Sequence, residues 1–302
     1  MARFVVREVV CKSLINRVEG MPFRWSINPY RGCRHACVYC YARPTHEYLG
    51  LNGADAFQEV VFAKVNAPQV ARAELARRAW RGESVAIGTA TDPYQQAETR
   101  YRLTRGILQA FCDFRNPLTI TTKSPMVLRD ADLLAALARH APVTVQMTIT
   151  TLDEELWRAL EPTTARPWKR LRALAALHER GIQTAVFLSP ILPGLTDDSD
   201  GLEAVVAAAA DARVDYLWGG TLRLGPGVRE YYLDFLQREH PELLGRYRRL
   251  YPHTYAPSEY QEQIRQRVDG LRARYGLLRE RPTKEPQSAA RPLQLSLLAT
   301  LP

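Results

Sequence analysis

Three cysteines close together carry the strongest chemical signal in the chain. Cys33, Cys37 and Cys40 lie within eight residues, in the order Cys-Arg-His-Ala-Cys-Val-Tyr-Cys. Spacers this short let three thiolates converge on one small metal centre. The whole chain contains five cysteines, an odd number. A clustered and odd set indicates metal or redox chemistry in preference to a framework of disulfides.

Two kinds of metal centre suit a cysteine triad. A structural zinc ion needs a fourth ligand, which Cys11, His35 or His46 could supply, although the usual zinc pattern is two separated pairs. A 4Fe–4S cluster held by three cysteines leaves one iron free to bind a small molecule through nitrogen and oxygen atoms. The spacing alone leaves both centres open.

The segments around the triad follow a repeating order of strand and then helix. This alternation predicts an α/β fold in which parallel strands are joined by crossover helices, as a partial barrel or as a doubly wound sheet. Six units are too few for a complete eightfold barrel. Hydrophobic periodicity predicts strands at 24–28, 84–89, 117–122, 143–149, 182–188 and 215–222, and helices at 68–80, 103–114, 131–139, 167–180 and 201–210.

Residues at helix ends support these assignments. Thr104 and Asp130 stand where N-caps are expected, since their side chains can accept a hydrogen bond from a free backbone N–H. Gly181 follows the last turn of the helix over 167–180, where a left-handed residue is common.

Beyond Gly227 the pattern changes to helices without strands, at 230–239, 242–250 and 258–277. We therefore divide the chain into a barrel with an N-terminal arm (1–227), a C-terminal helical extension (228–280) and a flexible tail (281–302). The extension interleaves aromatic rings with cations. These rings either stack on a nucleic acid strand or lie buried in a helical layer. The aromatic residues and cations concerned are Tyr247, Arg248, Arg249, Tyr251, His253, Tyr255 and Tyr260.

Composition describes a globular, basic protein. The 302 residues are 46% hydrophobic, and 41 Lys and Arg against 32 Asp and Glu give a net charge of +9. This balance favours polyanionic partners such as DNA, although an arginine-rich composition alone produces the same excess. No apolar run approaches the roughly 18 residues that a membrane span needs. Arg3, Arg7 and Glu8 interrupt any apolar N-terminal core, so we expect a soluble cytoplasmic protein without membrane contact.

The triad followed by Tyr41 resembles the signature of the radical S-adenosylmethionine (SAM) enzymes. Over 28–223 the chain is similar to their DNA-repair branch, typified by spore photoproduct lyase. The resemblance implies a partial (β/α)6 barrel, with the 4Fe–4S cluster bound by Cys33, Cys37 and Cys40 and with SAM as the second cofactor. It implies that a reductase, a flavodoxin or a ferredoxin supplies the electron.

The reaction that this resemblance implies is reductive cleavage of SAM to a 5′-deoxyadenosyl radical, which abstracts hydrogen from a substrate. A nucleic-acid base or lesion is the expected substrate. One alternative keeps the cofactors and acts on a peptide, a protein or a small molecule. Another is a zinc-stabilised nucleic-acid-binding module without catalysis.

Several residues match positions that contact SAM in the family. Lys123, in Thr-Thr-Lys-Ser, suits the SAM carboxylate, and Thr148 matches a SAM-binding serine. Tyr39 and Tyr41 match tyrosines implicated in relaying a hydrogen atom, and they are the expected catalytic residues. The expected cofactor contacts are Tyr41, Lys123, Thr148, Glu161 and Arg223.

One position departs from the lyase pattern. Thr89 stands where the lyase has a cysteine that donates hydrogen, three residues before Asp92. A threonine O–H bond is too strong to give its hydrogen to a carbon radical, so the reaction is expected to differ. Thr89, Asp92 and Tyr94 form the expected substrate loop, at the carboxyl end of a barrel strand where sites gather.

The tail contains a separate short motif. Gln294–Leu298 reads Gln-Leu-Ser-Leu-Leu, which resembles the pentapeptide that binds the bacterial sliding clamp, with leucine in place of the final aromatic residue. An apolar motif on a flexible tether suits docking in a hydrophobic groove. The alternative is that these leucines pack back on the barrel.

Overall fold

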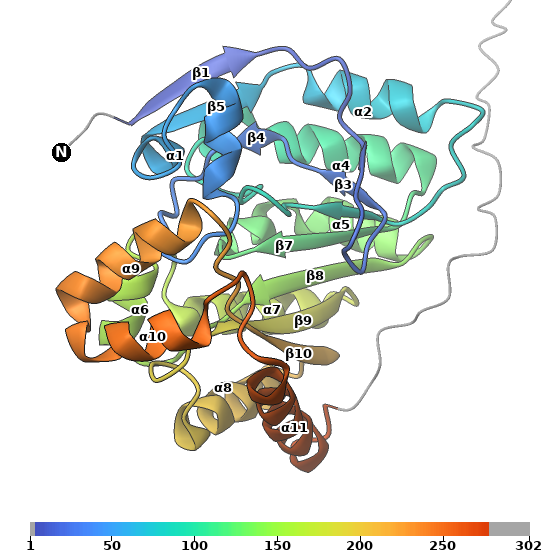
Figure 1. Ribbon diagram of the computed structural model, residues 1–302. Helices are drawn as coiled ribbons and strands as arrows, with labels where there is room; N and C mark the ends of the chain where they lie inside the picture. Colours follow the sequence, from blue (N-terminus) through green and yellow to red (C-terminus); the bar gives the residue numbers. More distant parts are fainter. Residues whose placement is uncertain (1–3, 278–302) are drawn as a thin grey trace, which may run out of the picture.

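A seven-stranded sheet forms the body of the fold (Figure 1). The computed structural model describes residues 4–277. Six parallel strands follow one another in chain order, so each is joined to the next by a crossover, and the predicted partial (β/α)6 barrel is confirmed. The sheet order is β10 (Tyr216–Thr221), β9 (Gln183–Ile191), β8 (Val143–Thr148), β7 (Leu118–Thr122), β6 (Val85–Ile87), β3 (Trp25–Ile27) and β2 (Asn16–Arg17).

The crossover helices cover the outside of this sheet. All five predicted helices are present, and α4 has the predicted bounds. They are α2 (Ala67–Leu75), α4 (Leu103–Phe114), α5 (Ala131–Ala138), α7 (Pro167–His178) and α8 (Ser199–Asp211). Shorter turns between them are η1 (Arg43–Leu49), α1 (Ala56–Glu59), α3 (Glu98–Tyr101), η2 (Pro125–Asp130) and α6 (Glu154–Leu160).

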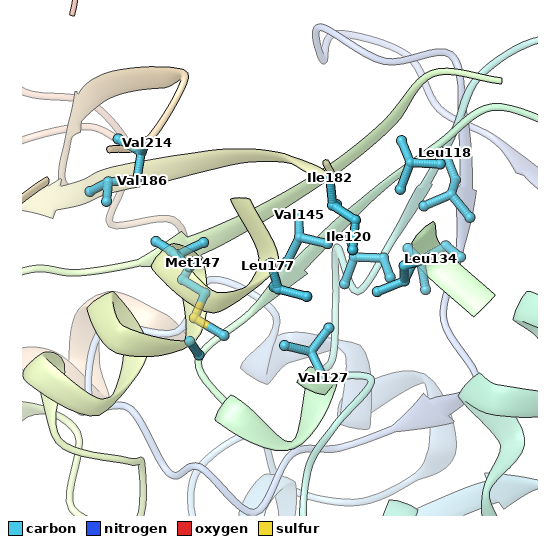
Figure 2. Close-up of a cluster of buried hydrophobic side chains, with 14 of the residues drawn as sticks. Leu118, Ile120, Val127, Leu134, Val145, Met147, Leu177, Ile182, Val186 and Val214 are labelled. Carbon is cyan, nitrogen blue, oxygen red and sulfur yellow. The ribbon is translucent and has the colours of Figure 1, made fainter. Parts of the chain in front are cut away.

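Alternation along the strands separates an apolar outer face from a polar inner face. Figure 2 shows Ile120 of β7 and Val145 of β8 among the buried side chains, together with Leu134 of α5 and Leu177 of α7. The residues between them in sequence face the other way, because successive side chains of a strand point to opposite faces. Thr119, Thr121, Gln146 and Thr148 line the inside of the barrel.

This inner face explains why the barrel is hollow. Complete barrels fill their interior with layers of bulky branched side chains. Here many inner positions are small or polar, and a cavity is left in the middle. They include Ala86, Gly88, Thr119, Thr121, Thr148 and Ser189.

A second, three-stranded sheet was not predicted. Its order is β1 (Val5–Val9), β5 (Val60–Lys64) and β4 (Tyr30–Arg31). β1 runs parallel to β5, and β4 runs antiparallel to it. Because β4 ends two residues before Cys33, this sheet anchors the start of the cysteine loop.

The helix caps differ from the prediction at both Thr104 and Asp130. Thr104 is not an N-cap: it lies inside α4, and the buried Glu98 carboxylate accepts its backbone N–H at 3.1 Å instead. Asp130 stands at the N-cap position of α5 without a capping bond, because its carboxylate binds Arg105 and Arg129, both at 3.0 Å. Gly181 has a φ of 75° after α7, as predicted.

Three helices close the C-terminal side: α9 (Val228–Glu239), α10 (Leu244–Leu250) and α11 (Ser258–Arg274). Tyr247 and Tyr251 are buried, which supports the helical-layer interpretation for them, whereas Tyr255 is 56% exposed. α11 packs beside β10 and α8 (Figure 1). No helix within 4–277 is long and apolar enough to cross a membrane. The motif at Gln294–Leu298 and the tail over 281–302 lie outside the described residues.

Candidate active site

A cavity of about 790 Å³ lies inside the curve of the seven-stranded sheet. Its wall combines the cysteine loop with the inner faces and carboxyl ends of β6 to β10. The volume falls within the range of ligand and cofactor pockets, and the carboxyl end of such a barrel is where its sites gather.

The cysteine loop is held in place by its own backbone. Gly32 lies at a φ of 77°, and a Cβ there would approach the Val60 carbonyl oxygen to 2.7 Å. Only glycine therefore fits this turn. The next residue, Cys33, donates its N–H to the Phe57 carbonyl at 2.9 Å, so the loop starts from a fixed point.

A buried arginine completes this support. The Arg43 guanidinium is fully buried and donates to the Cys37 carbonyl from Nη2 at 3.0 Å and from Nε at 3.2 Å. It also donates to the carbonyls of Ala36 and Ala54, at 3.2 and 2.7 Å. Sequence analysis missed Arg43, since an arginine three residues after Cys40 looks like any surface cation.

All three cysteine side chains line the cavity. Burial raises the pKa of the Cys33 thiol well above its usual value, and it raises the pKa of the Cys37 thiol to about 12. Within 4–277, no three His, Cys, Asp or Glu side chains are gathered into a ready-made site for a metal ion. Soft thiolates from one loop, at one end of a roomy cavity, are the donors that an iron–sulfur cluster uses, so the residues fit the expected group.

Lys123 lines the cavity at the end of β7. Burial works against the charge on its ammonium group, but electrostatic attraction to the Cys37 thiolate and the Glu161 carboxylate outweighs burial and raises the pKa of Lys123. The ammonium nitrogen lies 5.6 Å from the centre of the Tyr39 ring. A cation held in this wall favours an anionic group of a ligand in the cavity.

Asp92 joins three parts of the site. Its carboxylate accepts hydrogen bonds from the Thr122 hydroxyl and the Lys123 backbone N–H, both at 2.7 Å, and lies 3.1 Å from Nε2 of His35. Burial alone would raise the pKa of Asp92, but His35 and these hydrogen bonds lower it to about 2. Asp92 lines the cavity while it fixes the end of β7 against the cysteine loop.

Glu161 does not line the cavity, contrary to the expectation of direct cofactor contact. It is fully buried and forms an ion pair with the equally buried Arg170 at 2.5 Å. The Tyr39 hydroxyl donates to the same carboxylate, and Thr150 donates to it at 3.2 Å. Glu161 therefore orients Tyr39, which does line the cavity.

Most of the other expected site residues meet in the cavity. Tyr41, Thr89, Thr148 and Arg223 all line it, and the Tyr41 hydroxyl donates to the Thr89 carbonyl. Tyr94 does not: it is buried in the hydrophobic core behind the loop, so the expected substrate loop reaches the cavity only through Thr89 and Asp92.

The cavity also contains residues that sequence analysis did not select as site residues. Polar ones include Gln146 and Arg272, and aromatic ones include Phe187 and Trp218. Gln146 carried a usable signal, because a long amide at an inner-face position of a strand needs a polar partner. Arg272 carried none, since only the packing of α11 brings it to the barrel.

Comparison with known proteins agrees with this geometry. The family model described as the radical SAM superfamily matches residues 27–203. An uncharacterized protein of Mycobacterium tuberculosis is 41% identical over 296 residues, which cover 96% of this chain and 87% of that protein. An uncharacterized protein of Methanocaldococcus jannaschii is 30% identical over 235 residues, which cover 78% of this chain and 79% of that protein.

A solved structure shares the fold at low identity. It is a spore photoproduct lyase mutant with bound S-adenosylmethionine and dinucleoside spore photoproduct. The two chains superpose with a TM-score of 0.68 at 13% identity, over 89% of this chain and 79% of the lyase. Similarity at this level shows a common fold.

Proposed function

Because the chain belongs to the radical SAM superfamily, whose members use a 4Fe–4S cluster and SAM, we propose that it is an enzyme that acts on nucleic acid. The proposed reaction is lyase-like or base-modifying. When bound, the two cofactors supply one-electron chemistry that removes a hydrogen atom from an unactivated C–H bond. The protein has to bind them, exclude water and hold the substrate within reach.

The cavity residues divide this work. Cys33, Cys37 and Cys40 would hold the cluster at one end of the cavity. Lys123 would bind the SAM carboxylate, because its ammonium group lines the cavity and the nearby Glu161 carboxylate is already paired with Arg170. Hydrogen bonds from Thr148 would orient the rest of SAM, and Arg223 is proposed to contact the substrate in place of the SAM contact expected from the sequence.

The two tyrosines are the proposed relay for hydrogen. Tyr39 is oriented by Glu161, and Tyr41 donates to the Thr89 carbonyl beside it. A phenol O–H can pass a hydrogen atom to a carbon radical, whereas the Thr89 hydroxyl cannot. Thr89 therefore cannot donate a hydrogen atom to the substrate radical, and another group has to do so. In this step the proposed reaction differs from that of spore photoproduct lyase.

One observation carries the choice of nucleic acid. At the rim of the cavity the Arg223 guanidinium lies 5.7 Å from the centre of the half-exposed Tyr255 ring, and both line the cavity. A cation beside an exposed ring binds a phosphate and stacks on a base. The net charge of +9 supports the same substrate class, as does the dinucleoside bound by the lyase.

Salt-dependent DNA binding tests this substrate class. Single-stranded DNA should bind the reconstituted protein with an affinity that falls steeply as salt rises, because phosphate contacts release counterions. Arg223→Met should weaken binding about tenfold or more and flatten the salt slope. Arg180→Met, at an exposed position beyond α7, is the matched control. If the protein cleaves SAM but does not bind DNA even at low salt, its substrate is a peptide, a protein or a small molecule.

Lys123 gives a second test, independent of the substrate. Lys123→Met should raise the dissociation constant of SAM about tenfold or more, because a charged hydrogen bond contributes about 1.5–3 kcal/mol. Equilibrium dialysis of the reconstituted protein measures this constant. Lys169→Met, on the exposed side of α7, should bind SAM as the wild type does. An unchanged constant in Lys123→Met would remove Lys123 from the SAM site.

A further inference from the structure

The cavity extends along the inner face of the barrel to residues to which no role has been given above. Gln146 of β8, Phe187 of β9 and Trp218 of β10 line this part, which we call the inner subsite. Arg272 of α11 joins them from outside the sheet. α11 reaches this place because it packs on β10: a Cβ at Gly219 would lie 3.3 Å from the Val268 side chain, one turn before Arg272.

Gln146 presents an unused hydrogen-bond acceptor. Its Nε2 donates to the Thr121 hydroxyl oxygen at 2.5 Å, which fixes the side chain against the wall. Its Oε1 is buried and has no hydrogen-bond partner among the described residues. A buried acceptor without a partner costs about 1–3 kcal/mol. A ligand N–H that donates to this oxygen would remove that cost and so favour binding.

Arg272 presents an unused donor. Its Nη1 donates to the Asp269 carboxylate at 2.7 Å, and its side chain is 19% exposed. Its Nε is buried and finds no hydrogen-bond acceptor within 4–277. A guanidinium held by one carboxylate and free on another edge is suited to a phosphate, whose oxygens accept in the same plane.

Two aromatic rings line the same part of the cavity. Phe187 and Trp218 are opposite each other on β9 and β10, and their ring centres are 6.2 Å apart with a tilt of 50°. Rings in a cavity wall offer a face on which a planar ring can stack.

From this combination we propose that the inner subsite binds one nucleotide unit of the substrate. Gln146 accepts a hydrogen bond from the N–H edge of the base, Trp218 and Phe187 contact its face, and Arg272 binds its phosphate. The inference rests on the proposed nucleic-acid substrate and adds to it that the C-terminal helix α11 belongs to the substrate site.

The test uses thymidine 5′-monophosphate, because its ring carries a single N–H donor. Binding is measured by calorimetry on the reconstituted protein with saturating SAM and without reductant, so that no turnover occurs. Gln146→Leu and Arg272→Met should each weaken binding about tenfold or more. One matched control is Gln109→Leu, on the exposed side of α4. The other is Arg274→Met, at another position of α11, where the native arginine pairs with Glu203 of α8. Both controls should bind as the wild type does.

A methylated probe separates recognition from general damage to the fold. The wild type should bind 3-methylthymidine 5′-monophosphate, which lacks the N–H, about tenfold more weakly than the unmethylated nucleotide, and Gln146→Leu should no longer distinguish the two. Equal affinities in wild type and both variants, or no binding of the mononucleotide by a protein that binds DNA, would overturn the subsite and leave the proposed function standing. Failure to bind DNA at all is the separate result that contradicts the proposed function.

Discussion

Cys37→Ala is expected to reduce the iron and sulfide bound after anaerobic reconstitution from a full cluster to background. The loop then offers two thiolates to the cluster, and the alanine side chain supplies no ligand in place of the third. The loss should be complete, because two cysteines from one short loop hold a cluster far less well than three. Iron and sulfide analysis per chain, with the visible absorption of the cluster, measures the effect.

Cys112→Ala is the matched control for this change. Cys112 lies in α4, and its thiol donates to the Leu133 carbonyl at 3.3 Å, away from the cavity. It should retain the cluster. A full cluster in Cys37→Ala would contradict the proposed ligand set. A wild type that takes up one zinc ion and no iron would favour the zinc-stabilised binding module.

Arg170→Met is expected to lower the free energy of unfolding by about 3–5 kcal/mol, since removing one partner of a buried ion pair leaves the other charge uncompensated. Arg170 and Glu161 are both fully buried and 2.5 Å apart. Arg170 also donates to the Thr148 carbonyl at 2.9 Å, so the end of β8 should loosen as well. Equilibrium denaturation at neutral pH measures the loss.

The pH dependence of this loss identifies its cause. Burial alone would raise the pKa of Glu161, but Arg170 and Lys123 lower it from 4.5 to about 2. The folded protein therefore binds this proton more weakly than the unfolded chain does. The stabilisation is complete above about pH 4.5 and is lost as the pH falls toward about 2. The deficit of Arg170→Met should thus shrink at low pH, where Glu161 is neutral in the unfolded chain.

Arg166→Met supplies the control for the ion pair. Arg166 lies close in sequence, but its pair with Glu154 is 3.4 Å long and both side chains are half-exposed. Such a pair contributes about 0–1 kcal/mol. An equal loss in both variants, or a loss in Arg170→Met that does not change with pH, would show that the buried ion pair does not control the stability of this region.

The order of the barrel strands follows from patterns that are local in sequence. Alternation such as Leu118 to Thr122 separates outer from inner positions, and the cysteine spacing depends on one loop. β4 of the N-terminal sheet escaped prediction because it has two residues and gains its partners only from β5, far along the chain. Short strands of this kind depend on tertiary contacts more than on their own pattern.

The site could be predicted where a motif and a strand end coincide. Lys123 and Thr148 lie at the ends of β7 and β8, so their place at the cavity follows once the strands are known. Glu161 and Tyr94 follow strands too, but packing turns them away from the cavity, Glu161 toward Arg170 and Tyr94 into the core. Long-range packing of this kind has no signature in a single sequence.

Formation of 5′-deoxyadenosine is the most direct sign that this protein cleaves SAM reductively. The protein is reconstituted anaerobically with iron and sulfide, reduced in the presence of SAM, and analysed with and without single-stranded DNA. We expect 5′-deoxyadenosine from the wild type, an increase with DNA, and none from Cys37→Ala. A reconstituted wild type that holds a full cluster, binds SAM and yet forms no 5′-deoxyadenosine with or without DNA would contradict this expectation.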